Sequence, residues 1–134
     1  FGWSRGTFAA RADDGLELID CRITNAVRCV PPENKPTGAE IATCRRFLAT
    51  ELTRPPGPQA ILTLGKIAHD STLRALGLVL KDHPFKHGAR YRLPGGRLLA
   101  ASYHCSRYNL NTGRLTPAML DAVLAELRAF LPAA

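Results

Sequence analysis

The sequence contains no apolar stretch near the length of about 20 residues that a membrane-spanning helix needs. Its first residues, FGWSRGTFAARADD, have no apolar core behind a basic end, so they lack the pattern of a secretory signal. Internal repeats and low-complexity segments are also missing. Hydrophobic residues make up 46% of the chain and charged residues 22%, which is typical of globular proteins. We therefore expect residues 1–134 to form a single domain.

Acidic residues are scarce as well. The chain has 11 Asp and Glu against 18 Lys and Arg, which gives a net charge of +7. This excess favours a polyanionic partner such as nucleic acid. The same charge can also serve solubility, and composition alone leaves both interpretations open.

Cysteine occurs at four positions, Cys21, Cys29, Cys44 and Cys105. Without a secretory signal, disulfide bonds are not expected in a chain of this size. Cys21 and Cys29 would lie about 26 Å apart in an extended run, too far to bind one metal ion together. Cys29 and Cys44 can approach each other because a proline-rich loop folds between them. Their spacing is compatible with two buried thiols or with two ligands of a metal site that needs others.

Signals for strands and helices alternate along the chain, which predicts the α/β class. Strands are expected at residues 16–27 and 60–65, and a hairpin around Pro94-Gly95-Gly96. Helices are expected from Thr37, with Glu40 completing a capping box, to before Pro55; over residues 66–77; and from Pro117. Alternating elements of this kind form a three-layer α/β/α sandwich, in which helices cover both faces of a mainly parallel central sheet.

Two of these helices have a predicted inner face. On the first, the inner face comprises Ile41, Cys44, Phe47 and Leu48. On the last, it comprises Met119, Leu120, Val123, Leu124, Leu127 and Leu131.

Polar residues follow three predicted strands, at Asn25 to Cys29, at Gly65-Lys66 and at Tyr103-His104. Functional groups in such sheets gather at the carboxyl ends of the strands. We therefore expect these three segments to share one edge of the sheet.

Three blocks occur in order between about Asp20 and Leu124, and they resemble a known family. They read ITNAVRC–PP–NKP–EI–C, LG–IAHD and SYH-x-S–N–TGRLTPAML. They resemble the uracil-DNA glycosylases of the iron–sulfur branch, most closely family 5 (type b). The resemblance implies that Cys29 and Cys44 are the second pair of ligands of a four-iron four-sulfur cluster. The first pair, and a loop with a catalytic acidic residue, come earlier in the family's chains, so we expect this chain to be the C-terminal portion of such an enzyme.

The resemblance also implies roles for Asn25 and His104. The carboxamide of Asn25 matches the N3–H and O4 of uracil, whereas cytosine presents the reversed pattern. His104 would donate a hydrogen bond to the O2 of the departing uracil, where negative charge accumulates. Without the resemblance, a turn-capping Asn and a structural His would be the preferred interpretations. Cys105, where related motifs more often have Pro or Val, is expected to be a small packing residue.

Other residues near these strand ends suit DNA contact. The loop 106–114 offers Ser106, Arg107, Tyr108, Asn109 and Arg114, which can hold phosphates or fill the gap left by an extruded base. Gly65 and Lys66 open a helix where a phosphate can bind. The alternatives are a solvated loop and a tight strand-to-helix turn. His69 is expected to be structural, and no role is assigned to His83 or His87.

The predicted function is therefore removal of uracil, and of other deaminated bases, from DNA, with the base flipped out of the helix. The expected partner is uracil-containing DNA, with no membrane partner, and the complete protein is expected to be a cytoplasmic monomer. No carboxylate of this chain convincingly replaces the family's upstream acidic residue, so residues 1–134 alone should bind and cleave poorly. Two alternatives remain: a non-catalytic DNA-binding or partner-binding module with the same fold, and a zinc-stabilised domain that uses the same cysteines.

Overall fold

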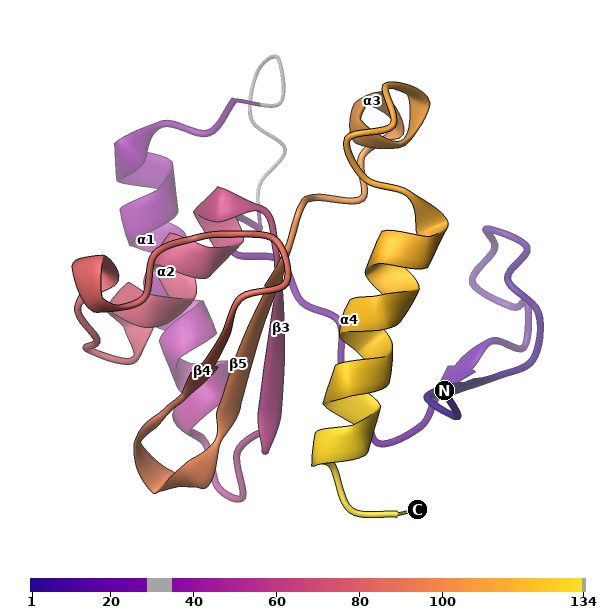
Figure 1. Cartoon of the computed structure of the whole chain (residues 1–134), viewed down its shortest axis with the longest axis horizontal. Coiled ribbons are helices and arrows are strands. Elements are labelled where there is room, and N and C mark those ends of the chain that lie inside the picture. The colour runs from indigo at the N-terminus through magenta and orange to yellow at the C-terminus, as the bar shows by residue number, and fades with distance from the viewer. Residues whose placement is uncertain (29–34, 134) are drawn as a thin grey trace.

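The computed structural model describes residues 1–28 and 35–133 and has a small sheet at its centre (Figure 1). The strands are β1 (Ser4–Arg5), β2 (Glu17–Leu18), β3 (Ala60–Leu64), β4 (Arg90–Arg92) and β5 (Leu98–Ser102). The α-helices are α1 (Gly38–Thr53), α2 (Lys66–Ala75), α3 (Arg107–Asn111) and α4 (Pro117–Phe130), with short 3-10 helices η2 (Leu80–Asp82) and η3 (Pro94–Gly96).

The central sheet has three strands in the order β3-β5-β4. Strands β3 and β5 are parallel, with Ala60 opposite Leu98, and β4 is antiparallel to β5, with Arg90 opposite Ala100. The turn between β4 and β5 is closed by the N–H of Leu93, which donates to the Arg97 carbonyl at 2.8 Å. This confirms the predicted hairpin around Pro94-Gly95-Gly96.

Helices cover both faces of this sheet (Figure 1). On one face, Ile61 and Leu99 pack with α1 and α2 through residues such as Leu73. On the other, Leu98 and Ala100 pack with Val123 and Leu127 of α4. Successive side chains of a strand point to opposite faces, so β5 contributes to both cores and is buried along its whole length. The α/β class is confirmed, with layers around a mixed, three-stranded sheet.

The predicted strand at residues 16–27 is largely wrong. Only Glu17–Leu18 is a strand, and it pairs with β1 in a separate two-stranded sheet. Asp20 has φ of 50°, in the left-handed region that cannot continue an extended strand. Residues 21–25 have no regular secondary structure, so Asn25 lies in an irregular segment and does not end a strand. Residues that favour strands need a neighbouring strand to form one.

The start of α1 matches the prediction. The N–H of Glu40 donates to Oγ1 of Thr37 at 3.2 Å, and the N–H of Thr37 donates to Oε2 of Glu40 at 2.9 Å, so the capping box is confirmed. The helix ends at Thr53, before Pro55, as expected. Its buried residues are Cys44, Leu48 and Leu52.

The prediction that Phe47 lies on the inner face of α1 is wrong, because its side chain is 42% exposed. The buried residues are spaced four apart, and Phe47 lies at the edge of their stripe. Its ring is instead flanked by the guanidinium groups of Arg28 and Arg46, at 5.1 and 4.9 Å from the ring centroid.

The segment 106–114 also differs from its prediction as a loop, because it contains the short helix α3. The last helix, α4, begins at Pro117 with Thr116 as its N-cap, as expected. In the described part of the chain, no helix combines the length and the apolar character that crossing a membrane requires.

Candidate functional site

The exposed side chain of His104 lies just beyond the end of β5, where the chain leaves the sheet. Its carbonyl accepts a hydrogen bond from Nδ2 of Asn109 at 2.8 Å. The N–H of Gly65 donates to the Ser102 carbonyl at 2.8 Å, which joins the ends of β3 and β5. Two of the three predicted strand-end segments therefore meet here.

Gly65 is required for this close approach. Its φ is 93°, which side-chain-bearing residues rarely adopt, and a Cβ at this position would lie 3.3 Å from Cβ of His104. The N–H of Gly65 is already engaged with Ser102. Lys66 forms an ion pair with Asp70 one turn along α2. The phosphate site proposed for Gly65 and Lys66 therefore stays a prediction, in which a phosphate would have to compete with Asp70 for the ammonium group.

Tyr103, the residue before His104, is held through both its backbone and its ring. Its N–H donates to Nδ1 of His87 at 3.1 Å. The rings of His87 and Tyr103 stack with centroids 5.0 Å apart and an interplanar angle of 30°. The guanidinium of Arg114 lies 5.0 Å from the centroid of the Tyr103 ring. Arg114 therefore belongs to the immediate surroundings of the His104 segment.

Helix α3 follows His104 directly and presents exposed side chains. Ser106 caps it by accepting the N–H of Asn109 at 3.2 Å. Arg107 is exposed, Tyr108 is 72% exposed and Leu110 is 43% exposed. Such a set could insert beside a base, which fits the predicted DNA contact. The Asn109 amide, by contrast, supports the backbone of His104.

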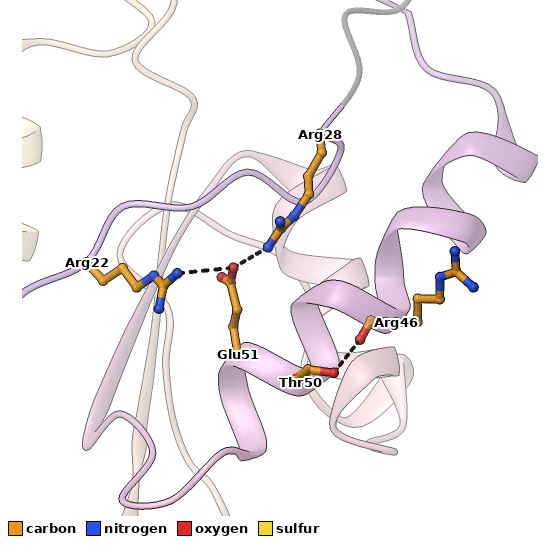
Figure 2. A network of polar contacts seen from close by, with 5 residues as sticks. All are labelled: Arg22, Arg28, Arg46, Thr50 and Glu51. Carbon is orange, nitrogen blue, oxygen red and sulfur yellow. Dashed lines mark hydrogen bonds and ion pairs between the residues drawn. The ribbon is translucent and has the colours of Figure 1, made fainter. Parts of the chain in front are cut away.

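The exposed Asn25 lies in a segment that contacts α1 through an arginine before it and an arginine after it in the sequence (Figure 2). Arg22 approaches Oε1 of Glu51 at 3.6 Å, and Arg28 forms an ion pair and hydrogen bond with the same oxygen. Ala26 packs against the core between α1, α2 and the sheet. The Glu51 side chain is only 15% exposed. Among the described residues, no hydrogen bond or ion pair joins Asn25 to His104 or to the residues that surround His104.

The structure describes three of the four cysteines. Cys44 is buried on α1 as a free thiol, whereas Cys21 and Cys105 are exposed. Exposure of Cys105 contradicts its predicted packing role, because the chain has already left the sheet at this point. Cys29 lies outside the described residues. Within residues 1–28 and 35–133, no group of three or more His, Cys, Asp or Glu side chains could hold a metal ion.

The histidines of the α2 to β4 region form a supporting network. His69 is fully buried, with Nδ1 at 3.2 Å from Oγ1 of Thr63 and Nε2 at 2.8 Å from the His83 carbonyl. This agrees with the structural role expected for His69. Sequence reasoning missed His87 and Glu51, since neither stands in a motif and both act on segments distant along the chain. No local signal in the sequence distinguishes Glu51 from other charged helix residues.

The chain is similar in sequence to known proteins along most of its length. A type-5 uracil-DNA glycosylase of Thermus thermophilus is 49% identical over 115 residues, which cover 86% of this chain and 52% of the relative. Proteins of the same name from Pyrobaculum aerophilum and Mycobacterium leprae are 41% and 42% identical, covering 92% and 87% of this chain and 53% and 52% of their own. The chain thus spans about half the length of these relatives. The sequence model described as "Uracil DNA glycosylase superfamily" matches residues 2–128, and the chain belongs to this superfamily.

Proposed function

We propose that the chain acts in a uracil-DNA glycosylase that hydrolyses the N-glycosidic bond of uracil in DNA and leaves an abasic site. The observation that carries the proposal is the 41–49% identity, over most of this chain, with relatives named type-5 uracil-DNA glycosylase. The exposed position of His104 at a strand end, with exposed residues of α3 beside it, supports the same function. Uracil-containing DNA is the proposed substrate, with other deaminated bases as further substrates.

In the proposed reaction, the uracil nucleotide is first flipped out of the duplex, because its glycosidic bond is inaccessible in the stack. Asn25 reads the base through its carboxamide, which accepts from N3–H and donates to O4. The bond between C1′ and N1 then breaks, and its electron pair goes to the uracil ring. His104 stabilises the resulting anion by donating a hydrogen bond to O2. Water adds to C1′, and the proton that it releases neutralises the uracil anion, so free uracil and an abasic site are formed.

Positive and polar groups around His104 would hold the DNA. Arg107, Tyr108 and Arg114 are exposed, and Ser106 and Asn109 are half-buried beside them. Contacts to phosphates position DNA without reading its sequence. The tip of α3, with Tyr108 and Leu110, is the part of this group best placed to enter the space of an extruded base.

We further propose that Cys29 and Cys44 are two ligands of a four-iron four-sulfur cluster. The donor set fits in part: Cys44 is a buried free thiol, but the described residues alone do not assemble a site. Bound to these thiolates, the cluster would stabilise the fold around the segment 29–44. The layers seen here would form part of a three-layer α/β/α sandwich in the complete protein, which we propose to be monomeric and cytoplasmic.

Excision of uracil by the full polypeptide that carries residues 1–134 tests the proposed function. In single-turnover reactions on duplex DNA with one U:G pair, His104→Ala should lower the rate about 100-fold to 1,000-fold, the usual cost of losing a donor to a developing anion. Asn25→Ala should lower the rate and weaken the preference for uracil over cytosine.

Cys105→Ala is the matched control, since Cys105 is the exposed neighbour of His104, and it should retain the rate of the unmodified protein. Full activity of both His104→Ala and Asn25→Ala would contradict the residue assignments. Binding of uracil-containing DNA without any excision would instead support a non-catalytic module.

A further inference from the structure

His87 lies in the turn just before the paired residues of β4. Regular pairing of β4 with β5 ends with Arg90 opposite Ala100, and beyond it Gly88 and Ala89 form a bulge opposite Ala101, in which the N–H of Gly88 donates to the Ala101 carbonyl at 2.8 Å. The N–H of Ala101 donates to the Ala89 carbonyl at 3.0 Å, and the N–H of Ala89 donates to the Lys86 carbonyl at 3.0 Å, so residues 86–89 form a turn and the ladder stops there. Two residues after Ala101, the N–H of Tyr103 donates to Nδ1 of the His87 side chain at 3.1 Å. Just past the end of the ladder, a side-chain nitrogen thus accepts the backbone N–H at the point where the chain leaves β5.

This hydrogen bond fixes the tautomer of the ring. Nδ1 of His87 accepts, so in the neutral imidazole the proton is on Nε2. The ring also stacks on Tyr103 at 5.0 Å, so the same side chain restrains the backbone and the ring of its partner. A half-buried N–H that loses its acceptor costs free energy unless the chain shifts to find another. The local backbone therefore depends on His87.

Two further groups complete the support of the His104 backbone. Gly65 packs directly against Cβ of His104, and Asn109 donates to its carbonyl at 2.8 Å. His87 acts one residue earlier, at the N–H of Tyr103. The three supports come from the β3 to α2 turn, from α3 and from the segment before β4. The His104 side chain is itself exposed, so these contacts act on it by fixing the position of its backbone and the direction of its Cα–Cβ bond.

We propose that His87 is a positioning residue for His104: as a neutral hydrogen-bond acceptor for the Tyr103 N–H, it fixes the point at which the chain leaves β5 and so aims the His104 imidazole at the departing base. The inference rests on the proposed function, in which His104 contacts the base. His87 itself touches neither base nor DNA in this role. Its effect should therefore be on the chemical step and not on DNA affinity.

Three substitutions of His87 in the full polypeptide distinguish the effect of the hydrogen-bond acceptor from the effect of the stacked ring. His87→Asn supplies an amide oxygen near the position of Nδ1 but removes the stacked ring. His87→Phe keeps a ring on Tyr103 but removes the acceptor, and His87→Ala removes both. In single-turnover uracil excision, His87→Phe and His87→Ala should lower the maximal rate roughly tenfold, because small misplacements of a catalytic group are costly. His87→Asn should stay within about threefold of the unmodified protein, and DNA affinity should be unchanged in all three.

A double-variant comparison decides whether the effect passes through His104. His87→Phe should cost nothing further in a His104→Ala background, because residues that act as a unit are not additive. Amide hydrogen exchange at Tyr103 should be faster in His87→Phe and unchanged in His87→Asn. An equal loss in both backgrounds, or a His87→Asn rate as low as that of His87→Phe, would overturn the inference. Excision that depends on His104 but not on His87 would overturn this inference alone, whereas no excision by the unmodified protein would overturn it together with the proposed function.

Discussion

Glu51 is the residue that ties the irregular Asn25 segment to helix α1. Its Oε1 faces both Arg22, three residues before Asn25, and Arg28, three residues after it (Figure 2). The Arg22 and Arg28 side chains are 77% and 47% exposed, so water screens each ion pair and each contributes little by itself. The carboxylate is only 15% exposed and serves both partners at once. Its main effect should be on the position of the segment, with a smaller effect on global stability.

Replacing Glu51 by Gln tests this interpretation at the scale of one residue. Glu51→Gln keeps the size of the side chain but removes its charge, so residues 22–28 should exchange their amide hydrogens faster, while the free energy of unfolding falls by only about 1 kcal/mol. If Asn25 reads the base, discrimination between uracil and cytosine should weaken as well. Asp121→Asn, at an exposed carboxylate on α4, is the control and should change neither quantity. Unchanged exchange at residues 22–28 in Glu51→Gln would show that the ion pairs do not position the segment.

At the scale of single elements, the sequence predicted what nearby residues determine. The capping box of Thr37 and Glu40 and the start of α4 at Pro117 depend on residues within one helical turn. The strand at residues 16–27 failed because a strand also needs a partner, and residues 21–25 pair with no strand in the described chain. The contributions of Glu51 and His87 were missed for a related reason. Their partners lie 23 residues and 16 residues away along the chain, so no local pattern reveals them.

The capping box predicts a measurable contribution to the stability of α1. Thr37→Ala removes the acceptor for the Glu40 N–H, and such a loss at an N-cap costs about 1 kcal/mol. We expect urea unfolding of the full polypeptide to show this decrease. Thr43→Ala is the matched control, because Thr43 is exposed within the same helix, where Ala is the better helix former. An equal loss of stability in both variants would argue against a specific role of the cap.

At the scale of the whole molecule, the layers were predictable but the composition of the sheet was not. Alternating apolar residues in β5 supply both cores, which is why helices cover both faces of the sheet (Figure 1). The sheet is mixed because the hairpin adds β4 antiparallel to β5. The candidate site likewise has features that could be predicted from the sequence and features that could not. His104 and Gly65 were expected at strand ends and do meet, whereas the position of Asn25 relative to them depends on long-range contacts of its irregular segment.

The proposed cluster gives a prediction for the complete protein. Cys44 is a buried free thiol, while Cys21 and Cys105 are exposed. Of these three cysteines, only Cys44 should therefore be needed to bind the cluster. In anaerobically purified full polypeptide, Cys44→Ser should therefore lose most of the iron and acid-labile sulfide, with the visible absorption that accompanies them. Cys21→Ser and Cys105→Ser should retain both, and because each also replaces a thiol by a hydroxyl, they control for the substitution itself.

Colourless unmodified protein that contains zinc would instead identify the site as a structural zinc site, for which thiolates are equally suitable ligands. Iron retained in Cys44→Ser would exclude Cys44 as a necessary ligand.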